Sequence, residues 1–240
     1  EAFIKTLNAI RHQTITDEAL FELNRETCQK KPGIESGIHL TTTNKSAHAI
    51  NTHTLNSLDS TEMEFEANYS KNFDTKSSPT DIRLKLKIGA QIMFVSNDSN
   101  GQWVNGTLGK IIDINETDLE LLIETQDQTH VTVTPHKWTM HIHRYDETTQ
   151  TLTPTPAGTF KQFPLKLAWA ITIHKSQGKT FKAVTIDLGN GAFADGQVYV
   201  ALSRCETLEN IRLKRPLRRR DIMTEPKVTE FLNKFTHSIY

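Results

Sequence analysis

The chain has 240 residues, 36% hydrophobic and 23% charged, and its 28 Lys+Arg balance 28 Asp+Glu. This length favours one large domain or two modest ones, and no apolar run approaches the roughly 20 residues that span a bilayer, so no membrane partner is expected. Two cysteines, Cys28 and Cys205, exclude a disulfide framework, and we expect a reducing compartment, the cytoplasm with its nucleoid.

The first part of the chain has the texture of an α/β domain. Apolar residues at helical spacing predict two helices within the first thirty residues, and Thr16 is typical of a cap before the second. A strand is predicted to end at Leu40 to Asn44, followed by a short helix from Lys45 to Leu55. The strand delivers Thr and Asn side chains to its carboxyl end, where open α/β sheets place their ligands.

From about Met63 the pattern changes to short β-branched stretches separated by turn residues. This spacing favours a small antiparallel barrel, inserted because α/β texture resumes afterwards, with the Thr-Pro run from Thr151 to Pro156 as its exit linker. The predicted strands are 91–95, 103–114, 119–123, 131–133 and 137–144.

The α/β texture returns after Pro164. An apolar stretch from Leu165 to Ile173 precedes a glycine turn, a buried strand from Ala183 to Leu188, and a helix that starts near Gln197. A last helix is predicted behind Pro226 from one apolar stripe at helical spacing, formed by Val228, Phe231, Leu232 and Phe235.

The run Ser176-Gln177-Gly178-Lys179-Thr180 contains GKT but does not form a Walker A loop. That loop needs a glycine five residues before its second glycine, so that backbone N–H groups wrap the phosphates. Ile173 stands at this position. The chain alone is therefore not expected to build a nucleoside triphosphate site.

The same segment nevertheless concentrates hydrogen-bonding side chains in a strand-to-turn transition that ends in glycine. Backbone donors beside a glycine approach anions closely, and hydroxyl, imidazole and amide groups can hold phosphodiesters. A capped turn with internally satisfied side chains is the alternative, and the segment by itself favours that alternative. The side chains in question belong to Thr172, His174, Lys175, Ser176 and Gln177.

The run VYVALSRC predicts a helix with one buried face. Gln197 and Arg204, seven residues apart, are expected to share the neighbouring face. A guanidinium held rigidly on a helix suits a γ-phosphate, although a surface ion pair is the commoner role of a single helical arginine. The buried face is formed by Val198, Ala201, Leu202 and Cys205.

Five segments in this order resemble a known family: LTTTN at Leu40, LKIGAQIMFVSND at Leu86, WVNGT at Trp103, FPLKLAWAITIHKSQGKTF at Phe163 and GQVYVALSRC at Gly196. The series is similar to the C-terminal half of superfamily-one helicases that move 5′ to 3′, the RecD-like and petite-integration-frequency (PIF-type) group. The resemblance covers nearly the whole chain.

The resemblance implies an α/β, RecA-like second motor domain of the P-loop NTPase class, at residues 1–62 and 157–240, interrupted at 63–156 by a small antiparallel β-barrel of the Src-homology-3-like type. In such helicases ATP lies between two RecA-like domains and single-stranded DNA crosses both. The N-terminal RecA-like domain, which supplies the phosphate loop and the Mg²⁺ ligands, is then a partner missing from this sequence. A family motif that precedes these residues is absent too, so we expect a cut just upstream of Glu1 and no turnover by this fragment alone.

The family motifs also imply roles for individual residues. Arg204 matches the arginine finger and is the expected catalytic residue, and Gln177 and Gly178 match positions that meet ATP. Positions linked to DNA contacts in the family are matched by Thr42, Thr43, Asn44, Thr172, His174 and Lys175. Functions in DNA repair and recombination follow from the resemblance in the same way, and no resident metal is expected in this half.

Three alternatives stay open. The barrel, with six basic residues between Arg212 and Arg220, could be a stand-alone nucleic-acid-binding or regulatory module, although this basic stretch can equally be a solvated connector. The charge distribution agrees with either view: twelve Lys+Arg stand against four acidic residues from 161 to 220, and six acidic residues without Lys or Arg lie from 111 to 136.

A metal-dependent nuclease would need His136, His141 and His143 as ligands, but no acidic residue has the spacing of a metal ligand. Trp103 and Trp138 could stack on bases but favour packing within the barrel.

Overall fold

The computed structural model describes residues 2–29, 37–146, 150–225 and 227. The predicted C-terminal helix with its apolar stripe lies outside these residues. The chain divides into two compact units, a discontinuous unit formed by Glu1–Thr52 and Trp169–Tyr240 and an inserted unit formed by His53–Ala168. The inserted unit is therefore wider at both ends than the predicted 63–156.

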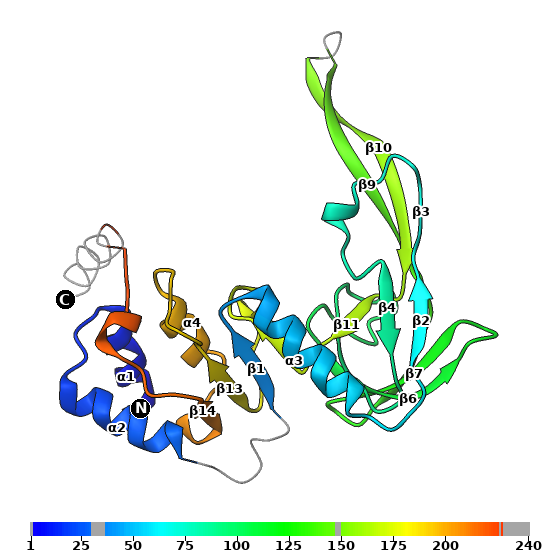
Figure 1. The fold of residues 1–240 in the computed structure, drawn as a ribbon. Helices are drawn as coiled ribbons and strands as arrows, with labels where there is room; N and C mark the ends of the chain where they lie inside the picture. The colour runs from blue at the N-terminus through cyan, green and yellow to red at the C-terminus, as the bar shows by residue number, and fades with distance from the viewer. Residues whose placement is uncertain (1, 30–36, 147–149, 226, 228–240) are drawn as a thin grey trace. The chain divides into compact units, whose positions relative to one another are not determined.

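A four-stranded parallel sheet forms the centre of the discontinuous unit (Figure 1). Its order is β12-β1-β13-β14, and the register aligns Leu40 of β1 with Ile171 of β12 and Ile186 of β13. Nearly all of the strand residues are buried, as expected for a parallel sheet covered on both faces. The strands are β1 (Ile38–Thr41), β12 (Ala170–Thr172), β13 (Val184–Asp187) and β14 (Ile211–Leu213).

The helices of this unit begin where the sequence predicts them. Thr16 caps α2, since its hydroxyl accepts a hydrogen bond from the backbone N–H of Ala19 at 3.2 Å. The helices are α1 (Ala2–Arg11), α2 (Asp17–Cys28), α3 (Asn44–Asn56) and α4 (Gln197–Leu202), with short 3₁₀ turns η3 (His174–Ser176), η4 (Leu208–Asn210) and η5 (Arg219–Asp221). None of the described helices is long and apolar enough to cross a membrane.

The inserted unit is built from antiparallel strands, as the sequence predicts. Its largest sheet has the order β11-β5-β6-β7-β8. On β7 buried and partly exposed residues alternate, which is the pattern of a strand with one face on the core. The strands of this sheet are β5 (Gln91–Phe94), β6 (Leu108–Asn115), β7 (Glu120–Thr125), β8 (His130–Val133) and β11 (Leu165–Leu167).

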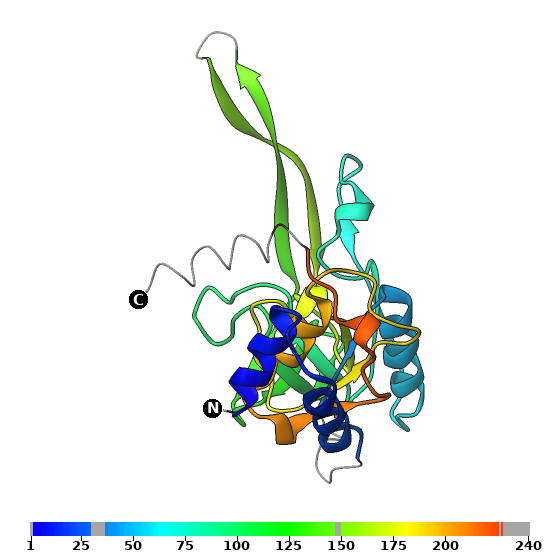
Figure 2. The ribbon, with the colours of Figure 1, turned by 90° about the vertical axis from the view of Figure 1, so that its left-hand side faces the viewer.

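A long hairpin corrects the predicted exit linker. Thr151 to Pro156 belongs to strand β10 (Thr151–Gln162), which pairs with β9 (His136–Asp146) along its whole length and extends well beyond the other strands of the unit (Figure 2). Pro154 and Pro156 are tolerated because β10 has its second neighbour, β3, only at Phe160 and Lys161 among the described residues. The remaining elements are β2 (Met63–Glu66), β3 (Asn68–Tyr69), η2 (Thr75–Ser77) and β4 (Arg83–Leu86).

Strand β11 explains the wider limit of the inserted unit. It was expected within the returning α/β stretch, but its residue Leu165 pairs with Phe94 of β5, so the chain re-enters the parallel sheet only at β12.

Trp103 and Trp138 both pack within the inserted unit, as predicted. Trp103 is 9% exposed and stacks on Phe94, with ring centroids 4.5 Å apart. Trp138 packs on Phe160 at 5.8 Å.

Candidate functional site

Two predicted motifs meet at the carboxyl edge of the parallel sheet. Strands β1 and β12 are parallel neighbours, and Thr41 pairs with Thr172 at their ends. The chain that follows each strand therefore emerges at the same edge, where open α/β sheets bind ligands. The ammonium nitrogen Nζ of Lys175 donates a hydrogen bond to Oδ1 of Asn44 at 3.0 Å, which joins the two segments directly.

The threonines at this edge hold the backbone. Thr172 is 5% exposed, and its hydroxyl accepts a hydrogen bond from the backbone N–H of Lys175. The hydroxyl of Thr43 accepts from the backbone N–H of Ser46 at 3.1 Å and so caps α3. Thr42 is half-buried. The interpretation as a turn with internally satisfied side chains thus holds for Thr172, and Thr43, which was expected to contact DNA, caps a helix in this structure.

The exposed side chains at the same edge include those of Asn44, His174 and Lys175. They are polar or cationic, and two of them lie on one 3₁₀ turn, η3. The backbone caps described above fix this turn against the end of β12. The edge therefore presents a small polar and basic surface on a constrained backbone.

A type II turn follows η3. The backbone of Gln177 has φ −56° and ψ 136°, Gly178 has φ +73°, and the N–H of Lys179 donates to the carbonyl of Ser176 at 3.1 Å. A type II turn needs a positive φ at its third residue, which explains the glycine. Gln177 and Gly178 are both exposed, so a ligand can approach the tip of this turn closely.

Arg204 lies close to this turn but not on the predicted helix. The helix α4 ends at Leu202 and Ser203 is its C-cap, so Arg204 follows the helix. The predicted buried face is confirmed, since Val198, Ala201, Leu202 and Cys205 are all buried. Gln197 is 3% exposed and accepts from the N–H of Phe193, so it does not share an exposed face with Arg204.

The guanidinium of Arg204 brackets the type II turn. Its Nη1 donates to the carbonyl oxygens of Ser176 at 3.2 Å and Lys179 at 2.9 Å. Its Nε donates to the carbonyl of Val200 and its Nη2 to the hydroxyl of Ser203, each at 2.9 Å. All four acceptors are neutral, and no carboxylate of the described residues forms an ion pair with Arg204. Of its five N–H donors one is left for a further acceptor.

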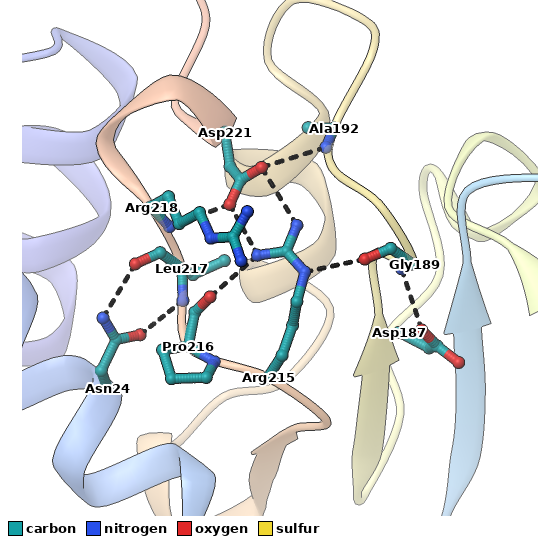
Figure 3. A network of polar contacts seen from close by, with 9 residues as sticks. All are labelled: Asn24, Asp187, Gly189, Ala192, Arg215, Pro216, Leu217, Arg218 and Asp221. Carbon is teal, nitrogen blue, oxygen red and sulfur yellow. Dashed lines mark hydrogen bonds and ion pairs between the residues drawn. The ribbon is translucent and has the colours of Figure 1, made fainter.

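Part of the basic stretch from Arg212 to Arg220 is structural, and Arg215 and the backbone of Arg218 contact a residue that sequence reasoning missed, Asp221 (Figure 3). Asp221 is 1% exposed, and its carboxylate accepts from Nη1 of Arg215 at 2.8 Å and from Nη2 at 3.1 Å. It also accepts from the backbone N–H of Arg218 at 2.8 Å and of Ala192 at 3.4 Å. Burial alone would raise the pKa of Asp221, but these hydrogen bonds and the Arg215 charge hold that pKa below its usual value.

The same network ties two loops of the discontinuous unit to each other and to helix α2. Nε of Arg215 donates to the carbonyl of Gly189, just after β13, and Asn24 of α2 exchanges two hydrogen bonds with the backbone of Leu217 (Figure 3). Lys214 pairs with Asp187 at 3.0 Å. The connector interpretation of the basic stretch therefore holds for Lys214 and Arg215. The sequence signal for this network is a single acidic residue, Asp221, after a basic run, and this pattern does not indicate which residues Asp221 contacts.

Of the histidines of β9, His136 and His141 belong to the described side chains, and neither joins a metal-binding group there. No group of three His, Cys, Asp or Glu residues among the described part of the chain could hold a metal ion. His136 instead lies edge-on against Trp138, with centroids 4.6 Å apart, and His141 is exposed. The described residues thus give the metal-dependent nuclease alternative no support.

Comparisons with known proteins bear on the whole chain. No family model matches it. The ATP-dependent DNA helicase Pif1 of Bdellovibrio bacteriovorus is 34% identical over 239 residues, covering 97% of this chain and 51% of that protein. Unliganded Pif1 from Bacteroides sp matches with a TM-score of 0.84 at 30% identity, over 98% of this chain and 54% of that one. A Bacteroides Pif1 helicase in complex with ADP-AlF3 and ssDNA matches with a TM-score of 0.78 at 30% identity, over 98% of this chain and 54% of that one.

The chain therefore spans about half the length of these relatives. The similarity extends over both compact units, because it covers nearly all of the chain. The resemblance that the five motifs predict is thus confirmed: along nearly its whole length this chain is similar to Pif1-type DNA helicases and corresponds to a C-terminal part of such a protein.

Proposed function

We propose that this chain is the second half of an ATP-dependent DNA helicase motor. The observation that carries the proposal is the segment from His174 to Lys179, which joins two kinds of contact within six residues. Its first turn presents Lys175 beside Asn44, and its second turn is bracketed by Arg204. A DNA contact and a nucleotide contact on one short segment are what a motor needs to convert phosphate chemistry into movement.

In the proposed nucleotide site, Gln177 and Gly178 meet the phosphates from the tip of the type II turn. The exposed glycine permits close backbone approach, and Arg204 is the arginine finger that neutralises charge on the γ-phosphate. The phosphate loop and the ligands of Mg²⁺ would come from an N-terminal RecA-like domain of the same protein. ATP and Mg²⁺ are thus cofactors of the complete protein, and this half holds neither by itself.

In the proposed DNA site, Asn44, His174 and Lys175 contact the phosphates of single-stranded DNA. Thr42, Thr43 and Thr172 belong to the same site, where Thr43 and Thr172 act by shaping the backbone. The Thr43 hydroxyl caps α3, and the Thr172 hydroxyl accepts from the backbone N–H of Lys175 in η3. Side chains that position the backbone, together with side chains that contact phosphates, suit the binding of DNA without sequence preference. The Pif1 structure in complex with ADP-AlF3 and ssDNA supports both ligands for this class of protein.

The antiparallel inserted unit fits the small Src-homology-3-like barrel that the family resemblance implies. Its five-stranded sheet and its hairpin are antiparallel throughout, and its core contains stacked aromatic side chains. The discontinuous unit then corresponds to the second RecA-like domain, and repair or recombination of DNA in the cytoplasm is the proposed setting. Loss of DNA binding on removal of the barrel would instead favour a role of the barrel in binding.

The decisive experiment is ATP turnover by the complete protein with the substitution Arg204→Ala. Removal of an arginine finger lowers turnover by about 10³-fold or more, while binding of a nucleotide analogue stays measurable. A Lys5→Ala variant on exposed α1 serves as the control and should keep normal turnover. Near-normal turnover by Arg204→Ala would reject the arginine-finger assignment, and absence of any DNA-stimulated turnover in the unaltered protein would reject the motor itself.

A further inference from the structure

The hydrogen bonds of Arg204 to the two ends of the type II turn connect the proposed nucleotide site with the proposed DNA site. Both N–H groups of Nη1 are used, one on the carbonyl of Ser176 and one on the carbonyl of Lys179. These two residues flank Gln177 and Gly178, the tip that the proposed function assigns to ATP. A third link joins the same parts through the backbone, because the N–H of Phe181 donates to the carbonyl of Arg204 at 2.9 Å.

Carbonyl oxygens are weak competitors for a guanidinium. Hydrogen bonds between Arg and phosphate are charge-assisted and roughly twice as strong as bonds to neutral acceptors. No described carboxylate holds Arg204 in place. An incoming phosphate that takes the Nη1 donors therefore removes the bracket from Ser176 and Lys179.

The turn that would be released also carries the proposed DNA contact. Ser176 is fully buried and is the last residue of η3, the 3₁₀ turn that contains Lys175. The hydroxyl of Ser176 donates to the carbonyl of Ile173, and Lys175 reaches Asn44 from the same turn. A continuous series of contacts thus leads from Arg204 through Ser176 to Lys175 and Asn44.

We propose that Arg204 is a latch as well as a finger: without nucleotide its guanidinium fixes the turn at Ser176–Lys179, and contact with phosphate frees this turn and changes the grip of Lys175 and Asn44 on DNA. The latch rests on the proposed function, since it assumes both ligands. It differs from a simple finger in one respect, because a finger acts only when nucleotide is bound, whereas the latch acts when nucleotide is absent.

The test uses the complete protein without nucleotide and with ADP and aluminium fluoride. Hydrogen exchange is followed in peptides that cover residues 174–181, and affinity for a fluorescent oligothymidine is measured by anisotropy at fixed salt. The variants are Arg204→Ala, Arg204→Lys, which keeps the charge but cannot bracket two carbonyls in the same way, and Ser203→Ala. The last removes the acceptor of Nη2 and the hydrogen bond from the Ser203 hydroxyl to the carbonyl of Val200, but leaves both hydrogen bonds of Nη1 in place.

The latch predicts that Arg204→Ala without nucleotide exchanges about tenfold faster at 174–181, while peptides of β1 are unchanged. Oligothymidine affinity in the unaltered protein should shift about fivefold or more with nucleotide, and this shift should vanish in the variant. Arg204→Lys should behave like Arg204→Ala, and it replaces that variant if the alanine protein fails to fold. Ser203→Ala should behave like the unaltered protein.

The latch would be overturned, and the finger left intact, by one result. In it, hydrogen exchange and DNA affinity without nucleotide are the same in Arg204→Ala, Arg204→Lys and the unaltered protein. The two proposals also fail in different ways. Lost turnover in Arg204→Ala together with unchanged nucleotide-free behaviour rejects only the latch, whereas an unaltered protein that binds no oligothymidine and turns over no ATP rejects both.

Discussion

Lys175 and Asn44 stand 131 positions apart in the chain, and Nζ of Lys175 lies 3.0 Å from Oδ1 of Asn44. The contact exists because β1 and β12 are parallel neighbours whose carboxyl ends coincide. The whole inserted unit lies between the two residues in sequence. The insertion of this unit between β1 and β12 therefore leaves the pairing of their carboxyl ends intact.

The contact between Lys175 and Asn44 predicts coupled effects on DNA binding. Lys175→Ala in the complete protein should weaken oligothymidine binding severalfold and lower the salt dependence by about one released counterion, because one phosphate contact is lost. Asn44→Ala should weaken binding less. The double variant should cost less than the sum, because the two side chains share a hydrogen bond. Salt titrations by anisotropy measure all three, with Lys5→Ala as control; strict additivity would contradict the shared site.

The buried Asp221 predicts a strong dependence of stability on one carboxylate. Asp221→Asn leaves Arg215 with a neutral partner and should lower the free energy of unfolding by about 3 kcal/mol at pH 7, as expected when a buried ion pair is broken. Urea unfolding followed by circular dichroism measures this change. Asp127→Asn, an exposed carboxyl on the inserted unit, should change the unfolding free energy by less than about 0.5 kcal/mol.

The pH dependence of the same pair has a definite sign. Folding lowers the pKa of Asp221, so its contribution to stability is fully present above the unfolded pKa of about 3.9 and is lost as pH falls through the lower, folded pKa. The unaltered protein and Asp221→Asn should therefore converge in stability below about pH 4. A difference between them that is constant from pH 7 to pH 3 would show that the carboxylate charge does not stabilise the fold.

The backbone conformation at Gly178 predicts that a side chain there lowers the stability of the protein although it causes no steric clash. Its φ is +73°, and a Cβ built there meets no atom within 4 Å. Gly178→Ala should therefore lower stability by about 1 kcal/mol through the left-handed conformation alone, and Gly178→Asn by less, because Asn tolerates this region. In the complete protein ATP turnover should fall in the same order. Thermal unfolding and a coupled ATPase assay test this, and equal effects of both substitutions would argue against a type II turn.

The two cysteines predict a difference in reactivity. Burial raises the pKa of the Cys205 thiol to about 11, so only about 0.1% of it is thiolate at pH 8. Burial also raises the pKa of Cys28, which is half-buried at the end of α2. Iodoacetamide at pH 8 should therefore alkylate Cys28 much faster than Cys205, with mass spectrometry as the readout. In urea both should react alike, and fast native alkylation of Cys205 would contradict its burial.

The sequence by itself determined the local elements and the family. The cap at Thr16, the helical stripe of α4 and the change to β-branched texture at Met63 are all patterns within a few residues, and such patterns depend on backbone and side-chain preferences that neighbours set. Five motifs in one order gave the resemblance that the comparisons with Pif1 proteins confirm. The absence of a glycine at Ile173 likewise excluded a Walker A loop without any structure.

The ends of elements and the partners of polar groups were decided by tertiary structure. Arg204 lies outside α4 because the helix ends at Leu202, and Thr151 to Pro156 forms a strand because β9 supplies a partner along its length. The carbonyls of Ser176 and Lys179, which accept from Nη1 of Arg204, come from a segment that only the fold brings close. Hydrogen bonds form between groups that are adjacent in space, and spacing along the chain does not encode which distant groups become neighbours.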